Sequence, residues 1–241
     1  MSTPYNEDDI DFLDKLGVCA FKLASIHVTE PFLLKQAARK CKPIILSTGM
    51  ATLSEVQNAV RVIKEEGNNQ LILLHCTTNY PSSVSDANLR AMLTMKHSLK
   101  TLVGYSDHTQ TFTAAILSVG FEASVIERHF TLDKKMPGPD QATSLDPKGF
   151  AQFVQKIREA ESCLGSGIKE PTLAERKNMQ AMRRSIVAKV RIPANTVLTM
   201  AHMTLKRPAN GLLGNQLEQV LGKKSIKVIP KDAVIMLDSV K

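Results

Sequence analysis

The sequence contains no tryptophan, and only 5% of its 241 residues are aromatic. Aromatic residues are absent altogether after Phe153, so the rest of the chain offers no rings on which nucleic-acid bases could stack. Long hydrophobic runs are missing too: the apolar stretch Leu71–Leu74 is far shorter than the roughly 20 residues of a membrane-spanning helix. Residues 1–14 are acidic and do not resemble a secretion signal. We expect a cytoplasmic protein that binds neither membranes nor nucleic acid.

Cysteine is scarce and scattered along the chain. The four cysteines form no C-x-x-C pair, which argues against a disulfide scaffold and against a zinc site built from thiolates. We expect them to be reduced thiols or small buried hydrophobic side chains. They are Cys19, Cys41, Cys76 and Cys163.

An excess of charge of either sign is missing from residues 1–182, where basic and acidic residues balance. The net charge of +8 comes entirely from Arg183 onward, where eleven basic residues accompany three acidic ones. A basic module can bind a polyanion such as DNA, but without aromatic residues we prefer a solvated basic face that attracts a small anionic substrate. The change in composition predicts a separate C-terminal domain.

Short apolar runs alternate with amphipathic stretches over the first 165 residues. The predicted strands are Ala20–Ser25, Pro43–Thr48, Leu71–Cys76, Leu102–Ser106 and Ser124–Phe130. The predicted helices are Asp8–Leu16, Pro31–Arg39, Ser54–Glu66, Ala87–Lys96, Thr111–Val119 and Pro147–Leu164. We expect Ser54 to cap its helix and Gly67 to end it. Five successive strand–helix units are typical of a parallel sheet, so the predicted fold class is α/β.

The chain changes character after Leu164. The run Gly165–Gly167 and the charged residues that follow it predict a linker, and the segments beyond it predict a small β-rich domain. These segments are Ser185–Val190, Val197–Thr199, Thr204–Arg207, Ser225–Val228 and Ala233–Leu237. The predicted boundaries are 1–165 for the α/β domain, 166–183 for the linker and 184–241 for the small domain.

Polar and ionisable residues gather where the five predicted strands end. Because the carboxyl ends of parallel strands meet at one edge of the sheet, where ligands bind in such folds, we expect an active site there. Each residue taken singly could instead cap a strand or begin a loop. The residues are Lys22, Ser25, Ser47, Thr48, His75–Thr78, Ser106–His108, Glu127 and His129.

Two histidines, His108 and His129, stand at the ends of neighbouring predicted strands. Their imidazoles could share a divalent ion that acts as a Lewis acid on a carbonyl group. A buried histidine bonded to a carbonyl is the commoner arrangement, and the spacing alone leaves both possibilities open.

Lys22 is the one cation in an apolar strand. It could pair with a phosphate or carboxylate, or it could form a Schiff base. The nearby hydroxyl groups favour the pairing with an anion. Asp140 lies in a turn and either structures it or accepts from substrate hydroxyls.

Several runs of the sequence resemble the N-acetylneuraminate (sialic acid) synthase family. The synthases of legionaminic and pseudaminic acid share most of these motifs, so the chemistry is better specified than the sugar. The resemblance extends through the C-terminal domain and covers essentially the whole chain. Its motifs are Lys42–Met50, Leu74–Pro81, Val103–Thr109, Glu127–Asp133, Met136–Asp140, Lys206–Pro208 and Gly222–Lys224.

The resemblance implies the last five to six units of a (β/α)8 TIM barrel, followed by an antifreeze-like SAF domain. It also implies that phosphoenolpyruvate condenses with N-acetylmannosamine, or a related N-acyl sugar, to give a nonulosonic acid and phosphate, with Mn²⁺ or Mg²⁺ as cofactor. His108 and His129 would bind the metal. Lys22 would act with Thr3, Ser25, Ser47 and Ser106 on the phosphate and carboxylate. The remaining substrate-binding residues would be Thr78, Tyr80, Asp140 and Arg207, the last acting across a domain-swapped homodimer.

The sequence departs from the family pattern in three ways. Family members are about a hundred residues longer at the N-terminus, so we expect a truncated barrel that lacks a catalytic glutamate and a further lysine. After Ser25 the family has a small residue and then an acid, whereas Ile26 and His27 follow here. Gln141 replaces a frequent histidine. An inactive homologue that still binds the sugar or the anion is therefore the alternative function.

Overall fold

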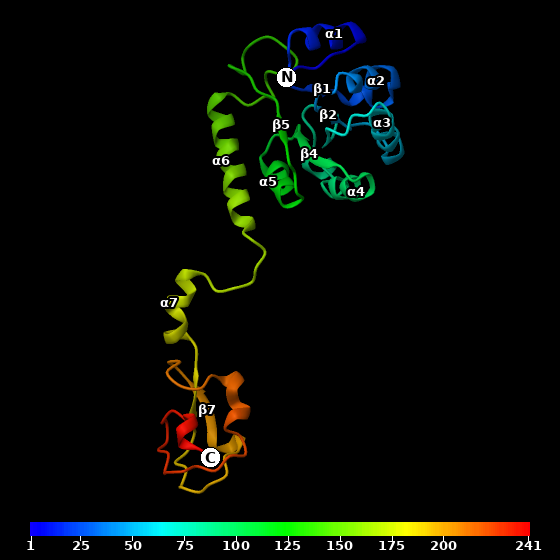
Figure 1. Ribbon diagram of the computed structural model, residues 1–241. Coiled ribbons are helices and arrows are strands. Elements are labelled where there is room, and N and C mark those ends of the chain that lie inside the picture. The colour runs from blue at the N-terminus through cyan, green and yellow to red at the C-terminus, as the bar shows by residue number, and fades with distance from the viewer. The chain divides into compact units, whose positions relative to one another are not determined.

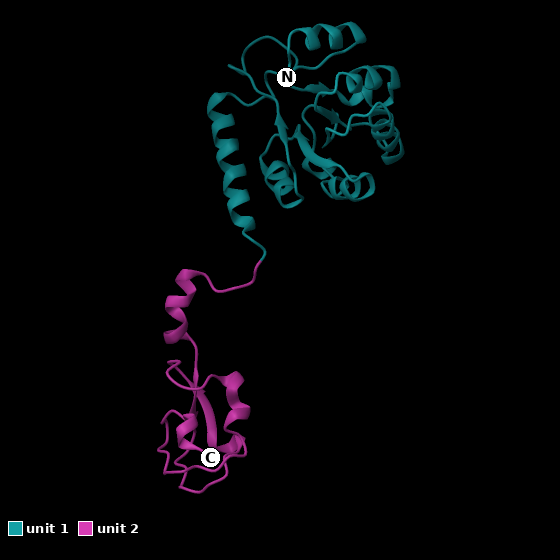
Figure 2. Cartoon of the chain, in the orientation of Figure 1, with its two compact units in different colours: residues 1–167 teal, residues 168–241 magenta.

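The computed structural model describes all 241 residues, which form two compact units, 1–167 and 168–241 (Figure 2). Each unit has a hydrophobic core of its own. None of the helices combines the length and the apolar character needed to cross a membrane.

The first unit is built on a parallel sheet of five strands in the order in which they occur along the chain (Figure 1). Its strands are β1 (Phe21–Leu23), β2 (Ile44–Ser47), β3 (Leu71–Cys76), β4 (Leu102–Asp107) and β5 (Ile126–Arg128). Its helices are α1 (Glu7–Lys15), α2 (Pro31–Arg39), α3 (Leu53–Glu65), α4 (Arg90–Leu99), α5 (Thr113–Gly120) and α6 (Pro147–Leu164). The sheet is curled into a partial (β/α)8 barrel, which confirms the predicted fold class.

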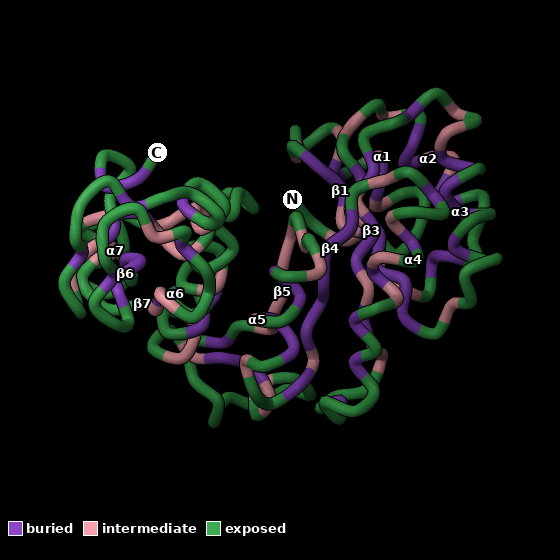
Figure 3. Tube along the Cα trace, turned by 90° about the horizontal axis from the view of Figure 1, so that it is seen from below, coloured by how far each residue is buried: buried purple, intermediate pink, exposed green.

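The two faces of this sheet differ because side chains alternate along each strand. One face packs against the surrounding helices and forms the core, with the strands buried and the outer helix surfaces exposed (Figure 3). Its members include Phe21, Leu23, Ile44, Leu46, Leu71, Leu73, Val103 and Tyr105. The other, concave face carries the polar side chains of Lys22, Ser47, Ser106 and Glu127, which bond to one another.

One local prediction needs correction. Thr52, not Ser54, caps α3: the Thr52 hydroxyl accepts from the Glu55 amide at 3.3 Å, and the Glu55 carboxylate accepts from the Thr52 amide at 2.7 Å. This capping box holds the pKa of Glu55 below its usual range through the bond from the Thr52 backbone. The four cysteines are free thiols, as expected: Cys76 is buried, and the other three are exposed.

The second unit is a small β-rich domain with an antiparallel pair, β6 (Ser185–Ala188) and β7 (Met203–Lys206). The other predicted strand segments form isolated bridges, such as Val197 with Lys224 and Ser225 with Val240. The segment predicted as a linker contains the helix α7 (Leu173–Met182), capped by Thr172 with Glu175.

His75 lies on the helix-facing side of β3, not at the mouth of the sheet where its position in the sequence had predicted it. Its ring is 6.2 Å from that of Tyr105, and its Nε2 atom bonds to the Ala87 carbonyl at 2.8 Å. Burial lowers the pKa of His75, because the charged imidazole loses its hydration.

This burial predicts a pH-dependent stability. Because the folded-state pKa of His75 is below its unfolded value of about 6.5, its contribution is present above 6.5 and is lost as the pH falls from there through the folded-state pKa. His75→Gln should therefore flatten the fall in the free energy of unfolding between about pH 7 and pH 5, measured by urea denaturation. The same change at the exposed His97 is the matched control; equal slopes in both variants would contradict the prediction.

Candidate functional site

Lys22 is held on the concave face by partners from two other strands. Its Nζ atom donates to Ser47 Oγ at 2.8 Å and lies 3.5 Å from Glu127 Oε2, while its side chain is 12% exposed. The ion pair with Glu127 joins the first strand of the sheet to the last. Four strand spacings of a flat sheet would span about 19 Å, so this contact requires strong curvature.

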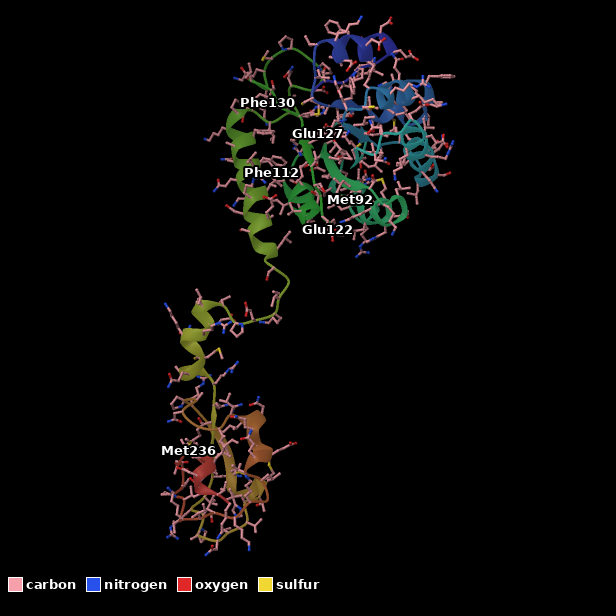
Figure 4. All side chains as sticks on the ribbon, viewed as in Figure 1. Met92, Phe112, Glu122, Glu127, Phe130 and Met236 are labelled. Atoms are coloured by element: carbon pink, nitrogen blue, oxygen red, sulfur yellow. The ribbon has the colours of Figure 1, made fainter.

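Glu127 connects the lysine to the neighbouring strand. Its Oε1 atom accepts from Ser106 Oγ at 2.7 Å, so one carboxylate contacts groups from both β1 and β4. Glu127 is labelled in Figure 4, on β5. The sequence placed it among the polar strand ends but not among the site residues. The alternation Ile126, Glu127, Arg128 is the signal that could have found it, because the middle residue must face away from the helix-packed side.

The structure brings His108 and His129 together at the end of β4 and β5. Their ring centroids are 5.3 Å apart and their planes meet at 79°. His108 Nδ1 donates to the Thr77 carbonyl at 2.8 Å, which leaves its Nε2 atom, 3.4 Å from Ser106 Oγ, with a free lone pair. Burial lowers the pKa of His108 and so favours the neutral ring. His108 is thus both bonded to a carbonyl and available as a ligand.

These two rings fit the donor set of a divalent metal ion. The carbonyl bond of His108 fixes its tautomer in the way that outer partners of metal-binding histidines do. No group of three histidine, cysteine, aspartate or glutamate side chains surrounds one point in the chain. The histidines would therefore supply two ligands and leave the other positions to substrate oxygens and water.

Tyr80 and Asp140 flank the histidine pair. The Tyr80 ring lies 4.3 Å from the His108 ring and 5.5 Å from the His129 ring. Tyr80 is 49% exposed to solvent. Asp140 Oδ2 is 3.8 Å from His129 Nδ1, while the Asp140 backbone carbonyl accepts from the Ser144 hydroxyl at 2.7 Å. Asp140 therefore structures its turn and also presents a carboxylate to His129.

A group of small polar atoms surrounds Gly49, next to the end of β2. The Gly49 amide donates to Ser25 Oγ at 2.9 Å, and Ser25 Oγ is 3.3 Å from Cys76 Sγ. The Thr78 hydroxyl is buried there and has no hydrogen-bond partner within the protein. An orphaned buried hydroxyl is costly unless a ligand satisfies it, so these atoms are suited to hold an oxyanion.

The two remaining predicted site residues, Thr3 and Arg207, make none of these contacts. Thr3 follows Ser2, whose carbonyl accepts from the Lys22 amide at 3.0 Å, so Thr3 is adjacent to β1. Arg207 belongs to the second unit, where its Nε atom donates to the Met182 carbonyl at 3.1 Å. Within the first unit the site thus combines an ammonium group and several hydroxyls with two imidazoles, an arrangement suited to an anion beside a metal-bound carbonyl.

Known proteins resemble both parts of the chain. The NeuB family model matches residues 1–169, and the SAF domain model matches residues 183–241. N,N'-diacetyllegionaminic acid synthase of Campylobacter jejuni is 40% identical over 237 residues, which cover 98% of this chain and 71% of that protein. Pseudaminic acid synthase of the same species is 36% identical over 228 residues, which cover 95% of this chain and 66% of that protein. The crystal structure of N-acetylneuraminic acid synthetase of Leptospira borgpetersenii in complex with citrate matches with a TM-score of 0.68 and 35% identity. The match covers 73% of this chain and 61% of that chain.

The close packing at Gly49 predicts that this position tolerates no side chain. A Cβ atom there would lie 2.1 Å from Thr78 Oγ1 and 3.1 Å from Ser25 Oγ. We expect Gly49→Ala to lower the free energy of unfolding by about 1–3 kcal/mol. Gly120→Ala is the control, because a Cβ atom at Gly120 meets nothing within 4 Å. Urea denaturation measures both; equal stabilities would contradict the packing described here.

Proposed function

The chain belongs to the NeuB family and carries a SAF domain, and from this we propose that it condenses phosphoenolpyruvate with an N-acylated aldose to give a nonulosonic acid and phosphate. Its relatives are named synthases of legionaminic, pseudaminic and sialic acids. N-acetylmannosamine is the substrate that we propose first, with the precursors of the other two sugars as the alternatives.

The continuous contact from the lysine to the histidine pair supports this proposal best. Lys22 bonds to Ser47 and Glu127, Glu127 accepts from Ser106, and Ser106 lies beside His108. The anion-binding part of the site and the ring nitrogens are therefore only one or two side chains apart. Two substrates held at these ends would have their reacting carbons side by side.

The residues divide the work between the two substrates. We assign Lys22, Ser25, Ser47, Ser106 and Thr3 to the phosphate and carboxylate of phosphoenolpyruvate. Thr78, beside Ser25, joins this group because its buried hydroxyl lacks a partner. Tyr80 and Asp140, which flank the histidines, would orient the sugar.

The bonds that change balance without any further reactant. The enol carbon bonds to the aldehyde carbon, water adds to the cationic carbon that results, and phosphate leaves as the carbon–oxygen bond breaks. His108 and His129 would hold a divalent ion, Mn²⁺ before Mg²⁺ because nitrogen ligands suit the softer ion, and polarisation of the aldehyde is the chemistry that such an ion supplies.

One observation favours the alternative, a homologue that binds sugar or anion without turnover. His27 stands where the family motif has an acid, and its side chain is 1% exposed with Nδ1 held by Glu30 at 2.7 Å. A side chain so enclosed offers no acid or base to a substrate. Binding of phosphoenolpyruvate without release of phosphate would identify this alternative.

Substitution of either histidine should abolish turnover that depends on the metal. We expect His108→Ala and His129→Ala to lower the rate at least a hundredfold, by analogy with lost outer-sphere and ligand contacts in metal enzymes. The assay measures phosphate released from phosphoenolpyruvate that carries ¹⁸O at the oxygen bridging carbon and phosphorus. Cleavage of the carbon–oxygen bond leaves this label in the phosphate. His97→Ala, on the exposed side of α4, is the control. Ordinary activity in either site variant would remove the metal assignment.

We further propose a domain-swapped homodimer in which Arg207 reaches the sugar of the partner subunit. Arg207→Ala should then raise the Michaelis constant for the sugar at least tenfold and leave the turnover number within a few-fold, because a binding contact is lost without loss of a reacting group. Lys206→Ala, next to it, is the control. An unchanged Michaelis constant would contradict this role for Arg207.

A further inference from the structure

A buried ion pair joins the two strands that carry the histidines. Arg128 Nη1 lies 2.5 Å from Asp107 Oδ2, and the two side chains are 2% and 0% exposed. Asp107 and Arg128 are direct partners in the register of β4 and β5. Each precedes a histidine by one residue, so the pair lies on the helix-facing side of the sheet while the imidazoles lie beyond the strand ends.

Further bonds tie this pair to the backbone around His108. Asp107 Oδ1 accepts from the Thr109 amide at 2.9 Å, so one carboxylate holds the chain on both sides of His108. Arg128 Nη1 also reaches the Thr111 carbonyl at 3.5 Å, and that carbonyl accepts from the Thr109 hydroxyl at 3.0 Å. The loop that carries His108 is thus anchored to β5 by directional bonds.

Simple packing does not require charges in this place. Removing two ions from water is costly, and well-packed apolar side chains often stabilise a buried position as well or better. What an ion pair adds is direction: it fixes which residue of one strand faces which residue of the next. The Arg128 guanidinium also lies 6.0 Å from the Phe153 ring, which restricts its movement from the side of α6.

We propose that Asp107 and Arg128 are positioning residues that set the separation of His108 and His129, and thereby the affinity of the two rings for a divalent ion. The metal part of this inference rests on the proposed function. The positioning part does not, because it concerns the geometry of β4 and β5 in the absence of any ion.

The test measures Mn²⁺ binding to the full chain by the electron paramagnetic resonance signal of free Mn²⁺. Arg128→Lys keeps the charge but changes the geometry, and Asp107→Asn with Arg128→Gln removes both charges at similar volume. We expect the dissociation constant to rise 10–100-fold in both, the usual effect of losing outer contacts of a metal site. Arg39→Gln is the control, because the Arg39–Glu66 pair joins helices outside the site.

Urea denaturation of the same samples separates positioning from stability alone. If the ion pair served stability alone, the variants would unfold at lower urea concentration, but the folded variants would keep a Mn²⁺ dissociation constant within threefold of the parent. That result would overturn the proposal. The proposed function predicts that the unsubstituted chain binds Mn²⁺ and that His108→Ala removes this binding. If either result is absent, the proposed function fails. Amide hydrogen exchange of residues 107–111 and 128–131 then decides the positioning claim: faster exchange in Arg128→Lys supports it, and unchanged exchange contradicts it.

Discussion

Curvature of the parallel sheet is the constraint on which the site depends. The ion pair of Lys22 and Glu127 shows it most directly, because it connects the first and last of five strands, a contact that a flat sheet forbids. The core helices pack against one face of the sheet. The curvature turns the opposite face inward, so that side chains contributed by separate strands converge on a small volume. Lys22, Ser47, Ser106 and Glu127 meet there although more than a hundred residues separate the first from the last.

The two faces of β4 and β5 perform complementary tasks. On the concave face, Ser106 and Glu127 connect Lys22 to His108. On the helix-facing side, Asp107 and Arg128 form the buried pair that fixes the strand ends. Because successive residues of a strand point to opposite faces, a run of only three residues at the end of each strand supplies a residue of the concave face, a member of the buried ion pair and a proposed metal ligand. Tyr105 is buried on the same side of β4, and its own desolvation raises its pKa, with the charge of Asp107 as the next cause.

The sequence allowed the fold class and most elements to be predicted, because hydrophobic periodicity reflects burial directly. Its failures are local and concern partners that periodicity does not reveal. Ser54 and Thr52 are both plausible caps, and only Glu55, three residues after Thr52, distinguishes them. His75 shares the parity of Leu71 and Leu73, so alternation placed it on the core face even though its polarity suggested the mouth. The Asp107–Arg128 pair escaped notice because charged residues at strand ends are ordinarily solvated, and its burial depends on α5 and α6 covering that side.

We propose above all that one divalent ion binds between His108 and His129, beside Lys22 and the hydroxyl groups near it. The most direct measurement is anomalous X-ray diffraction at the manganese absorption edge, from crystals of the full chain soaked with Mn²⁺ and phosphoenolpyruvate. Our account predicts one strong peak within bonding distance of a nitrogen of both imidazoles, with the phosphate density on Lys22. A peak bound to other residues, or none at the histidine pair at saturating Mn²⁺, would contradict it.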